Sequence, residues 1–196
     1  MKLSKLKNIW MHVTEHKYAL LFIATALCII MVLNNSGKVI YPLRYRDNVL
    51  KYSARYNIDP YLVFAIIKAE SNFNPKAVSR KSAKGLMQIT DKTGAWGAEK
   101  TKIENFDTDD LYEPEININI GCWYLSNLMK EFNGNIDLVI AAYNGGSGNV
   151  NEWIKNSANN SDGNMLLKIP FKETREFQKK VKKFYHIYRQ LYEDEI

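Results

Sequence analysis

The sequence predicts a mainly helical, all-α domain that follows an N-terminal transmembrane helix. Three observations lead to this prediction. Apolar residues recur three or four positions apart along much of the chain, which is the spacing of one helix face. Asp, Asn, Pro and Gly residues stand where these patterns begin and end. Residues 18–33 form one uncharged, apolar run.

The composition limits the class of protein. Of the 196 residues, 46% are hydrophobic, so one domain can bury a core without help from disulfide bonds. The two cysteines, Cys28 and Cys122, lie far apart in apolar patterns, and we expect no disulfide framework, no metal site and no cofactor. The net charge of +6 suits a polyanionic environment. It comes without a dense basic face, so we expect no nucleic-acid partner.

Residues 1–33 have the features of a membrane-targeting segment. Residues 1–17 contain four lysines and one glutamate, whereas residues 18–33 contain no charge. A helix over 18–33 would be about 24 Å long, slightly less than a hydrocarbon core of about 30 Å, and snorkelling by Lys17 can offset the difference. Because the lysines precede the run, we expect residues 1–17 in the cytosol and the chain after the run outside the cell membrane.

Two other interpretations of this run stay open. It could belong to a cleaved signal peptide, which would make the protein secreted, but no small-residue cleavage site follows Leu33. It could also be a buried core helix, although such a helix normally carries polar residues that this run lacks. We favour a single-pass anchor at 18–33, a linker at 34–43 and a folded domain at 44–196.

The folded domain is predicted to begin with two helices. Within residues 43–56, four large residues fall on one helical face: Tyr45, Val49, Tyr52 and Tyr56. Asp59 and Pro60 then provide an N-cap and a proline at the first helical position. They open a strongly apolar helix that ends at Glu70.

The middle of the domain is less regular. Asn74 and Pro75 end the second helix, and residues 78–85 are predicted to form a polar loop. A short helix is expected to start at Leu86. Residues 115–132 include an alternating stretch typical of a strand, but their length and apolar spacing favour a helix.

Two further helices are predicted in the C-terminal part. Residues 135–143 form a short apolar helix that the glycines at 145, 146 and 148 end. Residues 156–164 are polar and are expected to form a loop. The last helix has an apolar face with lysines between its members, which are Phe177, Val181, Phe184, Tyr188 and Leu191.

Glu70 is the residue whose position best suits acid catalysis. It ends an apolar helix, where the helix dipole and the apolar neighbours both disfavour a negative charge. Both effects raise the pKa of a carboxyl group, and a partly protonated carboxylic acid can protonate a poor leaving group at neutral pH. On these local facts alone, a solvated residue at a helix end is the simpler interpretation.

Five short motifs in one order change this interpretation. Each motif is weak alone, but chance does not easily produce all five in sequence. They are ESNFNPKAVS at 70–79, GLMQIT at 85–90, GCWYL at 121–125, AAYNGG at 141–146 and IPFKETR at 169–175. With these motifs, residues 44–192 closely resemble the catalytic domain of soluble lytic transglycosylases, which share the goose-type lysozyme-like fold.

The resemblance implies a lysozyme-like helical domain with a cleft for the glycan strands of peptidoglycan. The catalytic glutamate of the family corresponds to Glu70. Five further positions match residues that line the family's cleft and bind substrate: Ser79, Gln88, Tyr143, Asn144 and Glu173. Each of the five also has a plainer structural explanation, as a loop hydroxyl, a helix cap, a core aromatic or an acid that opens a helix.

Three positions depart from the family pattern. Ser82 stands where many members have glycine, Thr90 and Asp91 where many have Met-Pro, and Gly145 where alanine is usual. The first change is expected to stiffen the loop. The second removes an apolar contact with the bound sugar and leaves the affinity of that subsite open. Within the motifs, Gly121 is most simply a close contact between helices.

The resemblance also implies a mechanism with one catalytic carboxyl group. It protonates the glycosidic oxygen between N-acetylmuramic acid and N-acetylglucosamine, and then takes the proton of the muramic C6 hydroxyl, which attacks C1. The product is a 1,6-anhydromuramic acid end, because an intramolecular nucleophile outcompetes water. Two alternatives stay open: a hydrolase on the same fold, with Asp91 or Asp107 as base, and a non-catalytic glycan-binding module.

Overall fold

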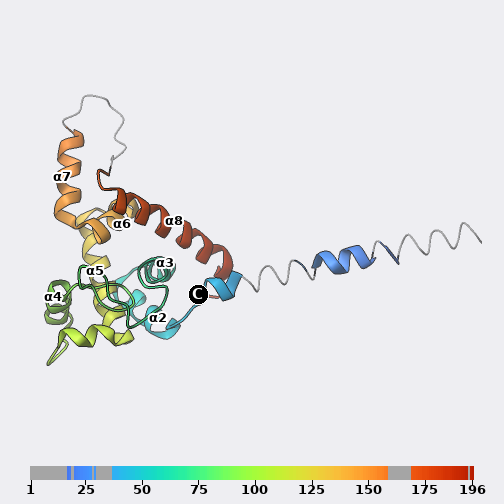
Figure 1. Cartoon of the computed structure of the whole chain (residues 1–196), viewed down its shortest axis with the longest axis horizontal. Coiled ribbons are helices and arrows are strands. Elements are labelled where there is room, and N and C mark those ends of the chain that lie inside the picture. Colours follow the sequence, from blue (N-terminus) through green and yellow to red (C-terminus); the bar gives the residue numbers. More distant parts are fainter. Residues whose placement is uncertain (1–16, 19, 28, 30–36, 159–168, 194) are drawn as a thin grey trace, which may run out of the picture. The chain divides into compact units, whose positions relative to one another are not determined.

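The computed structural model describes residues 17–18, 20–27, 29, 37–158, 169–193 and 195–196 (Figure 1). The chain divides into two compact units, Met1–Pro42 and Leu43–Ile196. In the first unit, the described residues between 17 and 29 are helical and mostly exposed. No helix among the described residues combines the length and the apolar character needed to cross a membrane.

The predicted N-terminal segments therefore lie only partly within the described residues. Apart from Lys17, the predicted cytosolic segment lies outside them. So do Cys28, five other residues of the predicted anchor and residues 34–36 of the predicted linker. The transmembrane helix at 18–33 stays a prediction.

The second unit is mainly helical, which confirms the fold class predicted for the domain. Its elements are α2 (Arg46–Tyr56), α3 (Pro60–Glu70), α4 (Asp91–Thr101), the 3-10 helix η1 (Thr108–Tyr112), α5 (Pro114–Glu131), α6 (Ile136–Gly145), α7 (Ser147–Ala158) and α8 (Lys172–Tyr192). Besides these helices, its described part contains two isolated β-bridges, from Lys84 to Val78 and to Ile89.

Helix α3 forms the centre of the core. Every residue from Tyr61 to Ile67 is buried, as expected for a helix that is apolar on all sides. The side chain of Asp59 caps its first turn by accepting a hydrogen bond from the backbone N–H of Tyr61 at 2.8 Å. The same carboxylate accepts a hydrogen bond from the Tyr185 hydroxyl of α8 at 2.6 Å. The start of α3 is thus fixed, and its last residue is Glu70.

Four other predicted helices are confirmed, as α2, α5, α6 and α8. Helix α5 packs against α2, α4, α6 and η1, while α8 packs along α3 and α6 (Figure 1). Residues 115–132 are therefore helical and not a strand. On α8, Phe177, Val181 and Tyr188 are buried as predicted, and the Tyr188 ring stacks on Phe64. Tyr192, and not the predicted Leu191, completes the buried face.

The helix predicted to start at Leu86 is wrong. Residues 85–88 form a turn in which Gly85 and Gln88 both have positive φ angles, +77° and +50°. A Cβ atom on Gly85 would lie 2.1 Å from the Leu111 carbonyl oxygen, so this position also requires glycine for space. The following helix, α4, begins at Asp91, after Thr90 has capped it.

The glycine-rich segment after α6 agrees only in part with the prediction. Gly146, with φ +85°, ends α6, but Gly148 lies inside a further helix, α7, that the sequence pattern did not reveal. The predicted loop at 156–164 begins within α7, and its residues from 159 onward lie outside the described residues. The short η1 was not predicted either. A capping box between Asp107 and Asp110 opens it.

Candidate active site

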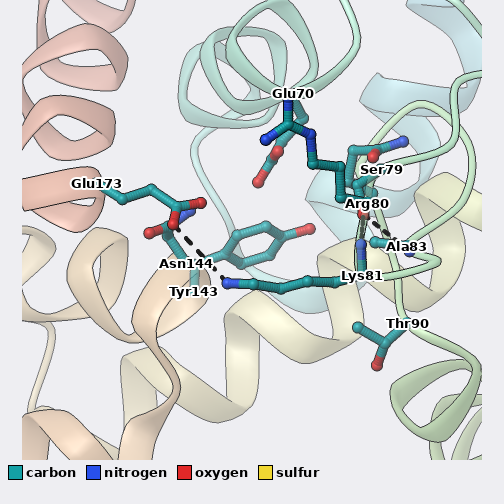
Figure 2. Close-up of a pocket in the computed structure, with 10 residues that line it drawn as sticks. Glu70, Ser79, Arg80, Lys81, Ala83, Thr90, Tyr143, Asn144 and Glu173 are labelled. Atoms are coloured by element: carbon teal, nitrogen blue, oxygen red, sulfur yellow. Dashed lines mark hydrogen bonds and ion pairs between the residues drawn. The ribbon is translucent and has the colours of Figure 1, made fainter. Parts of the chain in front are cut away.

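One pocket brings together all six residues that the sequence singled out. It has a volume of about 550 Å³ and lies among the end of α3, the loop before α4, the end of α6 and the start of α8. Its lining residues are Glu70, Ser79, Arg80, Lys81, Ala83, Gln88, Thr90, Tyr143, Asn144 and Glu173. Figure 2 shows Glu70 and Tyr143 pointing into the pocket from different elements, and Lys81 reaching across it to Glu173.

Glu70 is a half-buried carboxyl group at the last position of α3. Burial raises its pKa from the ordinary 4.5 to about 8. The positive charge of Lys180 works against this rise, and the negative charge of Glu173 adds to it. No described residue forms a hydrogen bond or an ion pair with the Glu70 carboxyl group. Because its pKa is about 8, this group holds a proton at neutral pH and can donate it.

Lys180 is a second feature of the Glu70 environment, and the sequence did not point to it. Its Nζ donates a hydrogen bond of 2.7 Å to the carbonyl oxygen of Ala69, the residue before Glu70. A cation is thereby held at the C-terminal end of α3, where the helix dipole favours positive charge. In the sequence, Lys180 is one of several lysines on an exposed helix face and carries no distinguishing signal.

Tyr143 and Asn144 lie at the end of α6. Tyr143 bonds to the turn before α4, and Asn144 bonds to α8. The Tyr143 hydroxyl donates a hydrogen bond of 2.8 Å to the carbonyl oxygen of Met87. Burial raises the Tyr143 pKa well above its ordinary value, so the hydroxyl keeps its proton. The Asn144 side-chain oxygen accepts a hydrogen bond of 2.9 Å from the Thr174 hydroxyl of α8.

Ser79 and Gln88 hold the loop that forms the opposite wall. The Ser79 Oγ accepts hydrogen bonds from the backbone N–H groups of Lys81 and Ala83, at 3.2 and 3.0 Å. The Gln88 Nε2 donates to the carbonyl oxygens of Ala77 and Gly85, at 3.1 and 2.9 Å. Both side chains therefore stabilise the loop as well as lining the pocket. Gln88 does not act as a helix cap, which was its plainer structural explanation, but bonds to two backbone groups of the loop.

The loop contains a strained position at Ser82, where the family usually has glycine. Ser82 has a φ of +60°, a left-handed conformation that glycine adopts without steric cost. A residue with a Cβ atom therefore takes a backbone conformation that glycine adopts at lower cost. The second departure, Thr90, lines the pocket and also caps α4, because its Oγ1 accepts a hydrogen bond from the Thr93 N–H.

Glu173 is the other carboxylate that lines the pocket. It lies in the first turn of α8 and pairs with Lys81 of the loop at 3.8 Å, and both side chains are largely exposed. Asp91 and Asp107, the two alternative bases, do not line the pocket. Asp91 pairs with Lys84 at 3.2 Å, and Asp107 caps η1.

The turn that carries Gln88 is tied to the core by Asn117, which is fully buried in α5. Its side-chain oxygen accepts a hydrogen bond of 2.7 Å from the Met87 N–H, and its nitrogen donates to the carbonyl oxygens of Lys84 and Leu111. A Cβ atom on Gly121 would lie 2.2 Å from the Met87 sulfur. The close contact expected of Gly121 is therefore made, but with this turn and not with another helix.

The described parts of the chain contain no group of three or more His, Cys, Asp or Glu side chains that could hold a metal ion. Cys122 is a free, buried thiol in α5. Among the residues that line the pocket, Glu70 has a carboxyl pKa of about 8, which suits proton transfer near neutral pH.

Comparisons with known proteins identify related sequences. Residues 47–166 match the family model of the transglycosylase SLT domain. The chain is 38% identical over 151 residues to the soluble lytic murein transglycosylase of Salmonella typhimurium, covering 76% of this chain and 23% of that protein. It is 39% identical over 123 residues to the membrane-bound lytic murein transglycosylase C of Edwardsiella ictaluri, covering 55% and 32%.

Solved structures show the same fold. The 70 kDa soluble lytic transglycosylase Slt70 of Escherichia coli superposes with a TM-score of 0.72 at 35% identity, over 79% of this chain and 25% of that one. The lytic transglycosylase Slt of Pseudomonas aeruginosa, solved as an inactive glutamate-to-glutamine mutant, gives 0.70 at 32% identity, over 78% and 25%. The chain spans about a quarter of the length of these soluble relatives.

Proposed function

Because the chain belongs to the transglycosylase SLT domain family, we propose that it is a peptidoglycan lytic transglycosylase. Such an enzyme is a lyase that cleaves the β-1,4 bond between N-acetylmuramic acid and N-acetylglucosamine and leaves 1,6-anhydromuramic acid ends. One observation carries the proposal for this chain: Glu70, with a pKa of about 8, lies in a pocket formed by the family's motifs.

Glu70 acts first as the general acid. Its carboxyl group is protonated below about pH 8, so it can give a proton to the glycosidic oxygen as the C1–O bond breaks. The N-acetylglucosamine unit leaves with a hydroxyl group. The inactive glutamate-to-glutamine mutant of the Pseudomonas aeruginosa relative supports the assignment of this step to a glutamate.

The resulting Glu70 carboxylate then acts as the base. It takes the proton of the muramic C6 hydroxyl while the hydroxyl oxygen bonds to C1, which closes the anhydro ring and restores the acid. The second pocket carboxylate, Glu173, is exposed and paired with Lys81, whereas Glu70 is the carboxyl group whose pKa is raised by burial. One carboxyl group therefore serves both steps.

The other predicted residues bind and orient the sugar. Tyr143 and Asn144 are held in place by hydrogen bonds to Met87 and Thr174, so they can present fixed polar groups to the substrate. Ser79 and Gln88 shape the loop wall through their backbone contacts and face the substrate with their remaining hydrogen-bonding atoms. Glu173 contributes its charge at the start of α8.

The membrane is the second proposed partner. Residues 18–33 anchor the chain, residues 1–17 stay in the cytosol, and the domain from residue 44 faces the cell wall. The support is the uncharged run at 18–33 after a lysine-rich segment. The Edwardsiella ictaluri relative is named a membrane-bound transglycosylase, which supports association with a membrane.

Product analysis tests the proposed activity. The purified full-length chain, in detergent, is incubated with peptidoglycan, and the released muropeptides are analysed by mass spectrometry. We expect anhydromuropeptides, which are one water lighter than hydrolysis products. Hydrated products alone would identify a hydrolase on this fold, and binding without release would identify a non-catalytic module.

A further inference from the structure

Three cations, Arg80, Lys81 and Lys84, lie on the loop at residues 78–85, but only Lys84 has a structural role. Lys84 is bound on several sides, because its Nζ lies 3.2 Å from Asp91, 3.2 Å from Asp109 and 3.1 Å from the Thr108 hydroxyl. It stabilises the contact of the loop with α4 and η1, and its side chain is only 13% exposed. It does not line the pocket.

Arg80 and Lys81 differ from Lys84 in both respects. Both line the pocket, and both are exposed to solvent. No described residue forms an ion pair or a hydrogen bond with the Arg80 guanidinium group. The Lys81 ammonium group pairs only with Glu173 within the described chain, at 3.8 Å, and these side chains are 80% and 73% exposed. Both cations are therefore available to a bound anion.

The charge of the pocket favours such an anion. Its lining contains two cations, Arg80 and Lys81, and two carboxyl groups, Glu70 and Glu173. Since the pKa of Glu70 is about 8, this group is mostly uncharged at neutral pH, and the pocket carries a net positive charge. Figure 2 shows Lys81 extending across the pocket towards Glu173, so its ammonium group lies within the pocket that Glu70 and Tyr143 also line.

We propose that Arg80 and Lys81 form a carboxylate subsite for the peptide stem that muramic acid carries on its lactyl group. This inference rests on the proposed function. In glycan that carries peptide stems, the lactyl carboxyl group forms an amide bond with the stem. The free carboxylates near the sugar therefore belong to the stem. The stem carboxylate replaces Glu173 as the partner of Lys81 and pairs with the Arg80 guanidinium, which suits two-point contact with a carboxylate. The enzyme thereby prefers glycan with charged stems.

Chemical amidation of the substrate tests this preference. Peptidoglycan is used untreated, or after its free carboxylates have been converted to primary amides, which keeps their size and removes their charge. The initial rate of anhydromuropeptide release is measured on both substrates. The wild-type chain is expected to act about three- to tenfold faster on the untreated substrate, because two exposed charge pairs each contribute modestly.

Matched variants connect the preference to the two residues. The double variant Arg80→Gln and Lys81→Met should bring the rate ratio to about one, whereas Arg80→Lys with Lys81→Arg should keep it. The control Lys76→Met removes a charge from an exposed residue outside the pocket and should keep both the ratio and the rates. Thermal melting confirms that each variant is folded.

The outcomes separate this inference from the proposed function. If the wild-type chain releases anhydro products but shows no preference, or if the double variant keeps the preference, the carboxylate subsite is wrong and the proposed function stands. If the wild-type chain releases no anhydro products from either substrate, the proposed function itself is wrong. The subsite is supported if the ratio of the rates on untreated and amidated peptidoglycan falls to about one in Arg80→Gln with Lys81→Met and stays at the wild-type value in the other variants.

Discussion

At the scale of single residues, the Glu70 carboxyl group is the part of the molecule on which the proposed chemistry depends. Replacing it by glutamine keeps its size but leaves no proton of useful acidity and no base. We expect Glu70→Gln to lower the rate of anhydromuropeptide release by at least about 10² to 10⁴ fold, the usual contribution of general acid–base catalysis. Binding to insoluble peptidoglycan should persist, and a pull-down assay measures it.

Glu173→Gln provides the comparison for this variant. Glu173 is exposed and pairs with Lys81, so its loss should weaken activity far less than the loss of Glu70. If the two variants lose equal activity, two carboxylates share the chemistry and the mechanism with one carboxyl group is wrong. Near-normal release by Glu70→Gln would contradict the role of Glu70.

The same carboxyl group links folding stability to pH. Its pKa is raised from 4.5 to about 8 in the folded protein. Between these values the folded chain binds a proton that the unfolded chain releases, so the contribution to stability is full below about pH 4.5 and is lost as the pH rises through about 8. We expect Glu70→Gln to remove this part of the pH dependence, measured by urea unfolding at about pH 5 and about pH 8.

Lys180 should set the upper end of the active pH range. Its charge lowers the Glu70 pKa, so Lys180→Met should raise that pKa further and move the alkaline decline of kcat/KM to higher pH. Lys179→Met removes a neighbouring exposed charge of the same helix and serves as the control. A pH profile unchanged by Lys180→Met would show that this lysine has no influence on the acid.

At the level of secondary-structure elements, helix α5 positions the turn at residues 85–88, which carries Gln88 in the loop wall of the pocket. The Asn117 side chain forms hydrogen bonds with three backbone groups, those of Lys84, Met87 and Leu111. Asn117→Ala leaves these backbone groups without partners, so we expect a loss of about 2–4 kcal/mol in the free energy of unfolding, together with lower activity. Urea unfolding and product release measure the two effects.

Asn119 is the matched control for this variant. It lies in the same helix and is also buried, but its side-chain oxygen accepts a single hydrogen bond, from the Tyr56 hydroxyl at 2.8 Å. Asn119→Ala should cost about 1 kcal/mol and leave product release per folded molecule unchanged. Equal effects of the two variants would mean that Asn117 has no special role in placing the turn.

At the scale of the whole molecule, the proposed anchor decides where the enzyme acts. We expect the full-length chain to stay in the membrane fraction of expressing cells and to resist extraction by salt, because an apolar helix is not released by screening charges. Protease added outside intact protoplasts should remove the domain. Soluble protein in the medium that begins after residue 33 would show that the segment is a cleaved signal peptide.

The helical class and most helices of the domain could be predicted from the amino-acid sequence. Helices α3, α5 and α8 could be predicted because their signals are local: apolar spacing, an Asp-Pro start and sufficient length. The ordered motifs also identified six residues that the structure places in one pocket. Local patterns were insufficient at Leu86 and at Gly148, where backbone conformation and not periodicity decides between turn and helix.

The environment of the candidate acid, in contrast, depends on how the helices pack. The bond of Lys180 to Ala69, the attachment of the turn to Asn117, and the different partners of Lys81 and Lys84 all join residues that are distant in sequence or indistinguishable by type. Such contacts arise when helices pack, and no spacing along the chain encodes them. The burial that raises the Glu70 pKa to about 8 arises in the same way, because solvent is excluded by several elements together.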